Sequence, residues 1–149
     1  MILGGRLRGF YRGTFLYFIY SRLTYFFQHF LRYPQKELDY EFEGKAMTFS
    51  TRDEISKRWF LPKFRNGYVH ERPVTTHMMR NLGGCSVFVD AGAFLGYYTV
   101  LSKTVNPNLH VFSFELDPTL VELIHVNVGL NRLKDVEVYN MALGSEAKP

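Results

Sequence analysis

A short apolar segment that runs directly into a glycine-containing loop constrains the fold of this chain more than any other feature. Residues 86–90, Ser-Val-Phe-Val-Asp, are rich in β-branched side chains and have the composition of a parallel strand that is buried on both faces. The loop from Asp90 to Gly96 follows, and helical spacing begins at Tyr97. A strand, a glycine loop and a helix in this order predict the start of a βαβ unit.

The same alternation continues along the sequence. Residues 110–115 form a second apolar run, and residues 136–140 form a third. Between them, Asp117 is a good N-cap and Pro118 suits the first helical position. We expect the buried face of this helix to consist of Leu120, Val121, Leu123, Ile124 and Val128. The pattern predicts an α/β fold, the first half of a doubly wound Rossmann-like sheet (β-α-β-α-β), in which ligands bind beyond the carboxyl ends of the strands.

A β-hairpin is expected before this sheet. Apolar and acidic residues alternate over 38–42, Gly44 and Lys45 are expected to form a two-residue turn, and the alternation resumes at Met47.

A short helix is expected after the hairpin. Ser50 or Thr51 is its predicted N-cap, Asp53 or Glu54 completes a capping box, and Pro62 is predicted to end the helix.

The first 36 residues form a basic, aromatic arm. They hold six arginine or lysine residues and no acid, whereas residues 37–149 hold 12 bases and 14 acids. The main domain is therefore nearly neutral, which argues against a nucleic-acid-binding face on it. We expect three segments: a helical arm at 1–36, a hairpin and helical lead-in at 37–85, and a Rossmann-like half-domain at 86–149.

Charges interrupt the arm too often for it to span a bilayer. The longest uncharged stretches, on either side of Arg22, have nine residues, whereas a spanning helix needs about 20 apolar ones. No signal-peptide pattern is present, so we expect a cytoplasmic protein. Residues 1–33 fit either a helix in peripheral contact with an anionic membrane or a helix packed on the following domain.

The sequence gives no indication of a disulfide or a metal site. Cys85 is the single cysteine, which excludes an intramolecular disulfide and a four-cysteine zinc site. The five histidines show neither HExxH nor another paired metal spacing. They are His29, His70, His77, His110 and His125.

Two chemical features are expected to meet at the carboxyl ends of the first two strands. Gly92 and Gly96 allow a ligand to approach the backbone closely. Glu115 lies 23 residues after Gly92, roughly the spacing at which an acid accepts hydrogen bonds from a ribose. Asp90 stands where a nicotinamide-binding loop has its first glycine, and its charge would repel a pyrophosphate. An acidic loop suits a ligand with an ammonium group and a sulfonium centre, such as S-adenosylmethionine.

Four motifs in order resemble the class I S-adenosylmethionine-dependent methyltransferases, and the FkbM-type family in particular. They are residues 88–99, 112–118, 127–131 and 140–144, and the resemblance covers roughly residues 50–149. It implies S-adenosylmethionine as the cofactor. It also implies that Asp90, Gly92 and Gly96 contact the methionine part of the cofactor. Glu115 would bind the ribose and Leu116 would contact the adenine. The backbone near Ala142 would close the adenine pocket. Glu71 either reaches the cofactor or is an exposed acid at a helix start.

The resemblance implies an O-methyltransferase that acts on a hydroxyl of a saccharide, glycolipid or natural product. Such enzymes have a seven-stranded sheet, and this sequence reaches only the third of those strands. We therefore expect an N-terminal piece that is inactive alone and exposes an apolar strand edge. Two alternatives remain open. One is a non-catalytic half-domain that completes its sheet with a partner subunit, and the other is a nicotinamide-dependent reductase, which Asp90 disfavours. The sequence indicates neither a general base nor an oligomeric state.

Overall fold

A computed structural model describes residues 19, 22–23, 36–64 and 67–144, and divides the chain into two compact units, Met1–Pro34 and Gln35–Pro149. The fold below is that of the second unit. Almost all of the predicted arm, with its helix and its membrane contact, lies outside the described residues. None of the helices that the structure describes is long and apolar enough to cross a bilayer.

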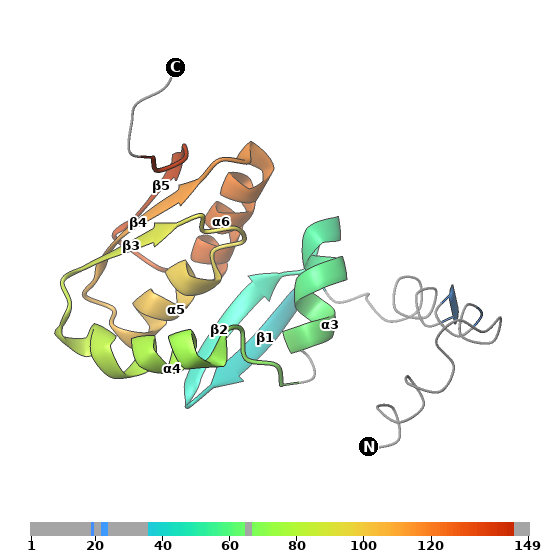
Figure 1. Cartoon of the computed structure of the whole chain (residues 1–149), viewed down its shortest axis with the longest axis horizontal. Coiled ribbons are helices and arrows are strands. Elements are labelled where there is room, and N and C mark those ends of the chain that lie inside the picture. Colours follow the sequence, from blue (N-terminus) through green and yellow to red (C-terminus); the bar gives the residue numbers. More distant parts are fainter. Residues whose placement is uncertain (1–18, 20–21, 24–35, 65–66, 145–149) are drawn as a thin grey trace. The chain divides into compact units, whose positions relative to one another are not determined.

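Three parallel strands form the main sheet in the order β3-β4-β5 (Figure 1). They are β3 (Val87–Ala91), β4 (His110–Glu115) and β5 (Val136–Asn140). Helix α5 (Tyr97–Val105) connects the first two strands and α6 (Pro118–Leu130) connects the last two. The predicted α/β fold with the order β-α-β-α-β is confirmed.

Helices α5 and α6 pack on one face of this sheet. Val111 and Ser113 are fully buried beneath them, whereas Val87 and Val89 are 51% and 52% exposed on the opposite face. The prediction that the first strand is buried on both faces is therefore wrong. Within the described part of the chain, β3 is an edge strand that pairs only with β4, and no second helical layer covers its outer face.

Helix α6 begins as predicted, because the Asp117 side chain accepts a hydrogen bond from the Thr119 N–H at 2.8 Å. Its buried face is narrower than predicted. Leu120, Leu123 and Ile124 are buried, but Val121 and Val128 are only half-buried. Asn127, a polar residue, occupies the next buried position.

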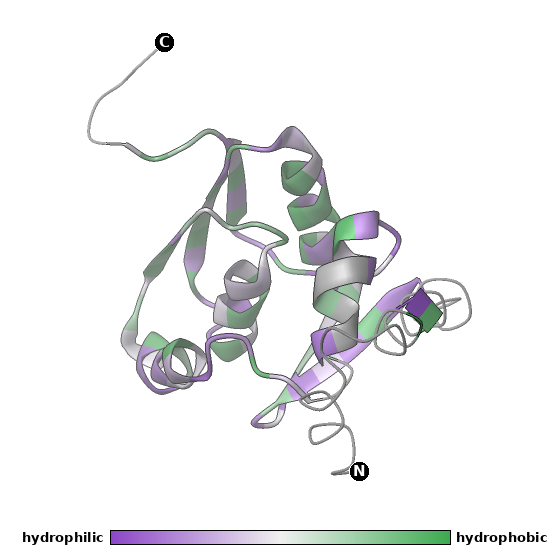
Figure 2. Cartoon of the chain, turned by 45° about the vertical axis from the view of Figure 1, so that its right-hand side comes forward, coloured by the Kyte–Doolittle hydropathy of each residue, from purple (hydrophilic) through white to green (hydrophobic). Residues whose placement is uncertain are grey.

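Strands β1 (Glu37–Phe42) and β2 (Lys45–Ser50) form the predicted antiparallel hairpin. Its turn residues are Glu43 and Gly44, with φ of 48° and 74°, as a type I′ turn requires. Lys45 pairs with Phe42, so the predicted turn at Gly44 and Lys45 is wrong by one residue. Exposed and buried residues alternate along β1, and both strands carry hydrophilic and hydrophobic residues (Figure 2).

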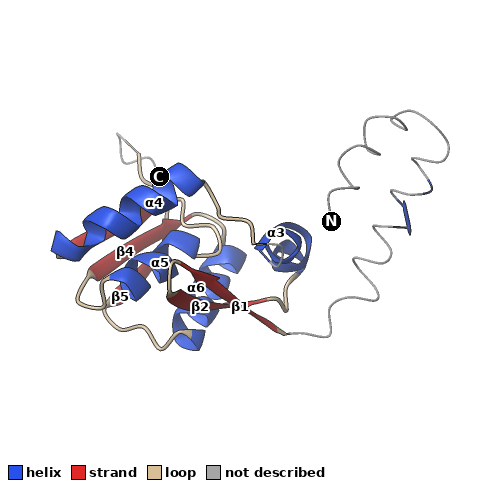
Figure 3. Cartoon of the chain, turned by 90° about the horizontal axis from the view of Figure 1, so that it is seen from below, coloured by secondary structure: helices blue, strands red, loops and turns tan. Residues whose placement is uncertain are grey.

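The hairpin packs against α5 and α6, so these two helices lie between the hairpin and the main sheet (Figure 3). The rings of Tyr40 and Phe49 lie 6.2 Å and 6.0 Å from the ring of Tyr97, the first residue of α5. The apolar residues of the predicted hairpin alternation are all buried. They are Leu38, Tyr40, Phe42, Met47 and Phe49.

The helix after the hairpin is capped later than predicted. The backbone N–H of Thr51 still donates to Lys36 C=O at 2.9 Å, so the chain is held in the hairpin at that point. Asp53 is the residue whose side chain accepts from the Ser56 N–H, at 2.7 Å. The predicted cap at Ser50 or Thr51 is therefore wrong.

Pro62 does not end this helix. A π-helical turn, η1 (Ser56–Phe60), leads directly into α3 (Leu61–Phe64). Pro62 thus lies inside a helical segment that continues from Ser56 to Phe64. Helix α4 (Arg72–Asn81) and the 3-10 turn η2 (Leu82–Gly84) then lead to β3.

Gly96 allows α6 to pack close to the start of α5, and its replacement tests this packing. Its φ is +80°, and a Cβ at this position would lie 3.2 Å from Cγ2 of Ile124. Gly96→Ala should lower the free energy of unfolding by about 2–5 kcal/mol, because left-handed strain adds to displacement of a buried side chain. Urea denaturation measures this loss.

Gly44→Ala is the matched control. Gly44 has a similar φ of +74° but nothing within 4 Å of the added Cβ, so only strain of about 1–2 kcal/mol is expected. Equal losses in the two variants would contradict a packing role for Gly96.

Candidate functional site

Parallel pairing places the carboxyl ends of β3 and β4 side by side. Ala91 pairs with Phe114 in the register. The backbone N–H groups of Gly92 and Ala93 both donate to Phe114 C=O, at 2.9 Å and 3.0 Å. The loop therefore folds across the end of β4, and the predicted site residues Asp90 and Glu115 lie at the same edge of the sheet.

The carboxylate of Glu115 holds this loop in place. Its Oε2 accepts a hydrogen bond from the Phe94 N–H at 2.8 Å. Its Oε1 accepts from the N–H groups of Leu116 and Asp117, at 2.8 Å and 3.0 Å. A carboxylate has about four acceptor positions, so these three bonds leave about one for a ligand.

Asp90 is buried between β3 and α5, with 7% of its surface exposed. The Thr99 hydroxyl donates to its Oδ2 at 2.6 Å and also lies 2.6 Å from the hydroxyl of Ser113. Burial raises the pKa of Asp90, the Thr99 hydrogen bond lowers it in part, and the charge of Glu115 raises it further. The first strand thus ends in a carboxylate whose ionisation is disfavoured.

The two predicted glycines have different surroundings. No atom lies within 4 Å of a Cβ built at Gly92, so a ligand could approach there. Gly96 faces Ile124 of α6, and its N–H donates to Ala93 C=O at 2.7 Å. Gly92 therefore offers open backbone, whereas Gly96 shapes the loop and the helix start.

Glu71 lies close to the start of α5. The Tyr98 hydroxyl donates to Glu71 Oε2 at 2.7 Å. Burial and this acceptor both raise the pKa of Tyr98. The Glu71 side chain is still 57% exposed, so both predicted roles for it stay open.

Apolar side chains at the carboxyl edge are exposed. Leu116 is 68% exposed after β4, and Met141 and Leu143 are 47% and 53% exposed after β5. Ala142 lies between the latter two and is exposed as well. The residues predicted to surround an adenine thus follow two neighbouring strands and leave an apolar rim free.

Sequence reasoning did not assign two residues that organise this edge. Phe94 has a left-handed φ of 55° and supplies the N–H that Glu115 binds. The Asn140 side chain donates to the carbonyl groups of Glu115 and Leu116, at 3.1 Å and 2.7 Å. Their inclusion in the family motifs at residues 88–99 and 140–144 was the only signal for either residue.

No group of three or more His, Cys, Asp or Glu side chains that could hold a metal ion occurs in the described ranges. The Nε2 atom of His110 lies 2.7 Å from Oε1 of Glu137. His29 lies outside the described residues.

Comparisons with known proteins give limited similarity. No protein-family model matches the chain, and no curated protein matches it. Among solved structures, TYW2 of M. jannaschii in complex with AdoMet is similar over 72% of this chain and 44% of its own, at 19% identity and a TM-score of 0.47. The M. jannaschii tRNA m1G37 methyltransferase is similar over 74% of this chain and 31% of its own, at 17% identity and a TM-score of 0.43. The chain thus spans less than half of either protein.

The raised pKa of Asp90 predicts how Asp90→Asn changes stability with pH. Native Asp90 binds its proton more tightly than the unfolded chain does, so its contribution to stability is lost as pH rises through the native pKa. Asparagine has no such titration and can still accept from Thr99. The difference in unfolding free energy, Asp90→Asn minus wild type, should therefore increase from acid to neutral pH.

Urea denaturation at a series of pH values measures this difference. Asp39→Asn, which removes an exposed hairpin carboxylate that accepts from the Thr48 hydroxyl at 2.9 Å, is the control for the loss of one acidic charge. A difference for Asp90→Asn that is constant with pH would contradict a disfavoured carboxylate.

Proposed function

We propose that this chain binds S-adenosylmethionine at the Asp90–Gly96 loop and Glu115. We propose further that the reaction it supports is the O-methylation of an acceptor hydroxyl. One observation carries the proposal: an acidic loop with open backbone at Gly92 lies against the acid that ends the next strand. Ligands of doubly wound sheets bind at this edge.

The charges at this edge fit the cofactor. Glu115 and Asp117 are exposed or half-buried acids in front of the buried Asp90, and Lys103 is the only lysine or arginine between Asp90 and Asp117. Its ammonium group donates to the carbonyl groups of Pro107 and Leu109, in the loop before β4. A negative edge favours a ligand with an ammonium group and a sulfonium centre over a diphosphate.

The groups present suggest a role for each residue. Asp90 and the backbone at Gly92 would face the methionine part, and Gly96 would keep the loop in shape. The remaining acceptor position of Glu115 would take a ribose hydroxyl. Leu116 and the backbone near Ala142 would contact the adenine, since this rim is apolar and exposed.

When bound, S-adenosylmethionine supplies an electrophilic methyl group. The oxygen of an acceptor hydroxyl would bond to the methyl carbon as the carbon–sulfur bond breaks, and the hydroxyl proton would pass to a base. The resemblance to the FkbM-type family favours a saccharide, glycolipid or natural product as acceptor. Membrane contact through residues 1–33 stays a prediction.

Isothermal titration of the full chain with S-adenosylhomocysteine and with NAD tests the proposal. We expect S-adenosylhomocysteine to bind and NAD not to bind. Glu115→Gln should weaken S-adenosylhomocysteine binding about tenfold or more, because a hydrogen bond to a charged group contributes about 1.5–3 kcal/mol.

Glu122→Gln, at an exposed acid on α6, is the matched control and should bind like wild type. Binding of NAD alone would favour the reductase alternative and overturn the proposal.

A further inference from the structure

The side chains of Asn127, in α6, and of Asn131, the C-cap residue of α6, bind the free edge of β2. Strand β2 pairs with β1 along its other edge. Asn131 Oδ1 accepts from the Thr48 N–H at 2.8 Å, and its Nδ2 donates to the Thr48 C=O at 2.6 Å. One carboxamide thus satisfies both backbone groups of Thr48, as a neighbouring strand would.

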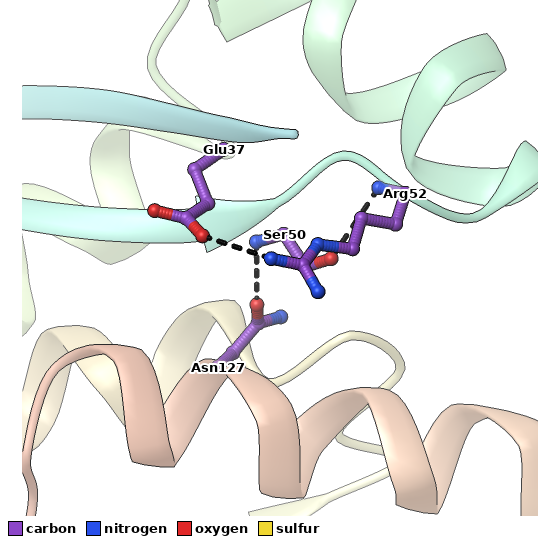
Figure 4. A network of polar contacts seen from close by, with 4 residues as sticks. All are labelled: Glu37, Ser50, Arg52 and Asn127. Carbon is purple, nitrogen blue, oxygen red and sulfur yellow. Dashed lines mark hydrogen bonds and ion pairs between the residues drawn. The ribbon is translucent and has the colours of Figure 1, made fainter. Parts of the chain in front are cut away.

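Asn127, one helical turn earlier, makes a different pair of bonds. Its Oδ1 accepts from the Ser50 N–H of β2 at 2.8 Å (Figure 4). Its Nδ2 donates to the Leu95 C=O at 2.8 Å. Leu95 lies in the Asp90–Gly96 loop, so a single side chain connects the hairpin to the loop.

The hairpin end of this connection is itself fixed. The Ser50 hydroxyl accepts from the Arg52 N–H at 3.3 Å, and the Arg52 guanidinium lies 3.3 Å from the Glu37 carboxylate (Figure 4). Glu37 pairs with Ser50 across the hairpin. The Ser50 N–H that donates to Asn127 therefore belongs to a defined strand end.

Burial makes the connection specific. Asn127 has no exposed surface, so water cannot replace either of its partners without a change in packing. Leu95 precedes Gly96, and its neighbour Phe94 supplies the N–H that Glu115 binds. The position of the Leu95 carbonyl therefore sets the part of the loop that meets Glu115.

We propose that Asn127 is a positioning residue for the Asp90–Gly96 loop, through which the hairpin controls the affinity of the site for its ligand. The ligand part of this inference rests on the proposed function. The loop part does not, because the bonds of Asn127 to Ser50 and Leu95 exist without a ligand. A purely structural asparagine would attach the hairpin, as Asn131 does, and leave the loop unaffected.

Asn127→Ala and Asn131→Ala form a matched pair for the test. Each removes one carboxamide, from α6 or its C-cap, and one attachment of the hairpin, but only Asn127 touches the loop. Hydrogen exchange of the amides of residues 92–98 is measured in the full chain without ligand. The dissociation constant for S-adenosylhomocysteine is measured well below the unfolding temperature of each variant.

We expect the loop amides to exchange about tenfold faster in Asn127→Ala than in wild type, and the dissociation constant to rise about tenfold. Asn131→Ala should stay within about twofold of wild type in both. The same change in both variants, or in neither, would overturn the inference.

Failure of the proposed function gives a different result. If wild type does not bind S-adenosylhomocysteine, the ligand part is overturned, and faster loop exchange confined to Asn127→Ala still supports the positioning of the loop. If Asn127→Ala does not fold, Asn127→Ser and Asn131→Ser replace the alanine variants. The exchange rate of the loop amides and the dissociation constant are then compared between these two variants with the same expected results.

Discussion

Parallel pairing of β3 with β4 is the constraint on which the site depends. The register of this pair sets Ala91 opposite Phe114, and the carbonyl of Phe114 then binds two loop amides. Helix α5 makes the pairing parallel by returning the chain across one face of the sheet, and the absence of a side chain at Gly96 lets it pack against α6. The edge that carries Asp90 and Glu115 is thus a product of backbone pairing and helix packing.

Polar groups buried behind this edge affect both the free energy of unfolding and the shape of the candidate site. Asp90 is held by Thr99, and Thr99 also contacts Ser113 of β4, so one hydroxyl joins the helix to two strands. A buried carboxylate opposes folding at neutral pH, which makes it unfavourable as a purely structural residue. Perturbed acids of this kind concentrate at functional sites. Asn127 adds a second buried link, from the hairpin to the same loop.

Local patterns predicted the elements well. The strands at 110–115 and 136–140 have their predicted bounds, and Asp117 caps its helix, because strand composition and capping chemistry depend on neighbours in the sequence. Apart from the predicted helix end at Pro62, the wrong predictions concern pairing or coverage. The turn is shifted by one residue because Lys45 pairs with Phe42. The helix cap is shifted because the Thr51 N–H donates to the Lys36 carbonyl. The exposure of Val89 depends on what covers the sheet. Sequence placed Asp90 and Glu115 at one edge, but Asn127 was only one residue in a family motif, since its partners are distant in the chain.

A crystal structure of the full chain with S-adenosylhomocysteine tests the location of the site most directly. The proposal predicts that the ligand lies across the carboxyl ends of β3 and β4, with a ribose hydroxyl about 2.6–3.0 Å from a Glu115 oxygen. It also predicts that the amino group of the ligand lies on the Asp90–Gly96 loop. A ligand bound elsewhere, with the loop and Glu115 unchanged and free of contact, would contradict it.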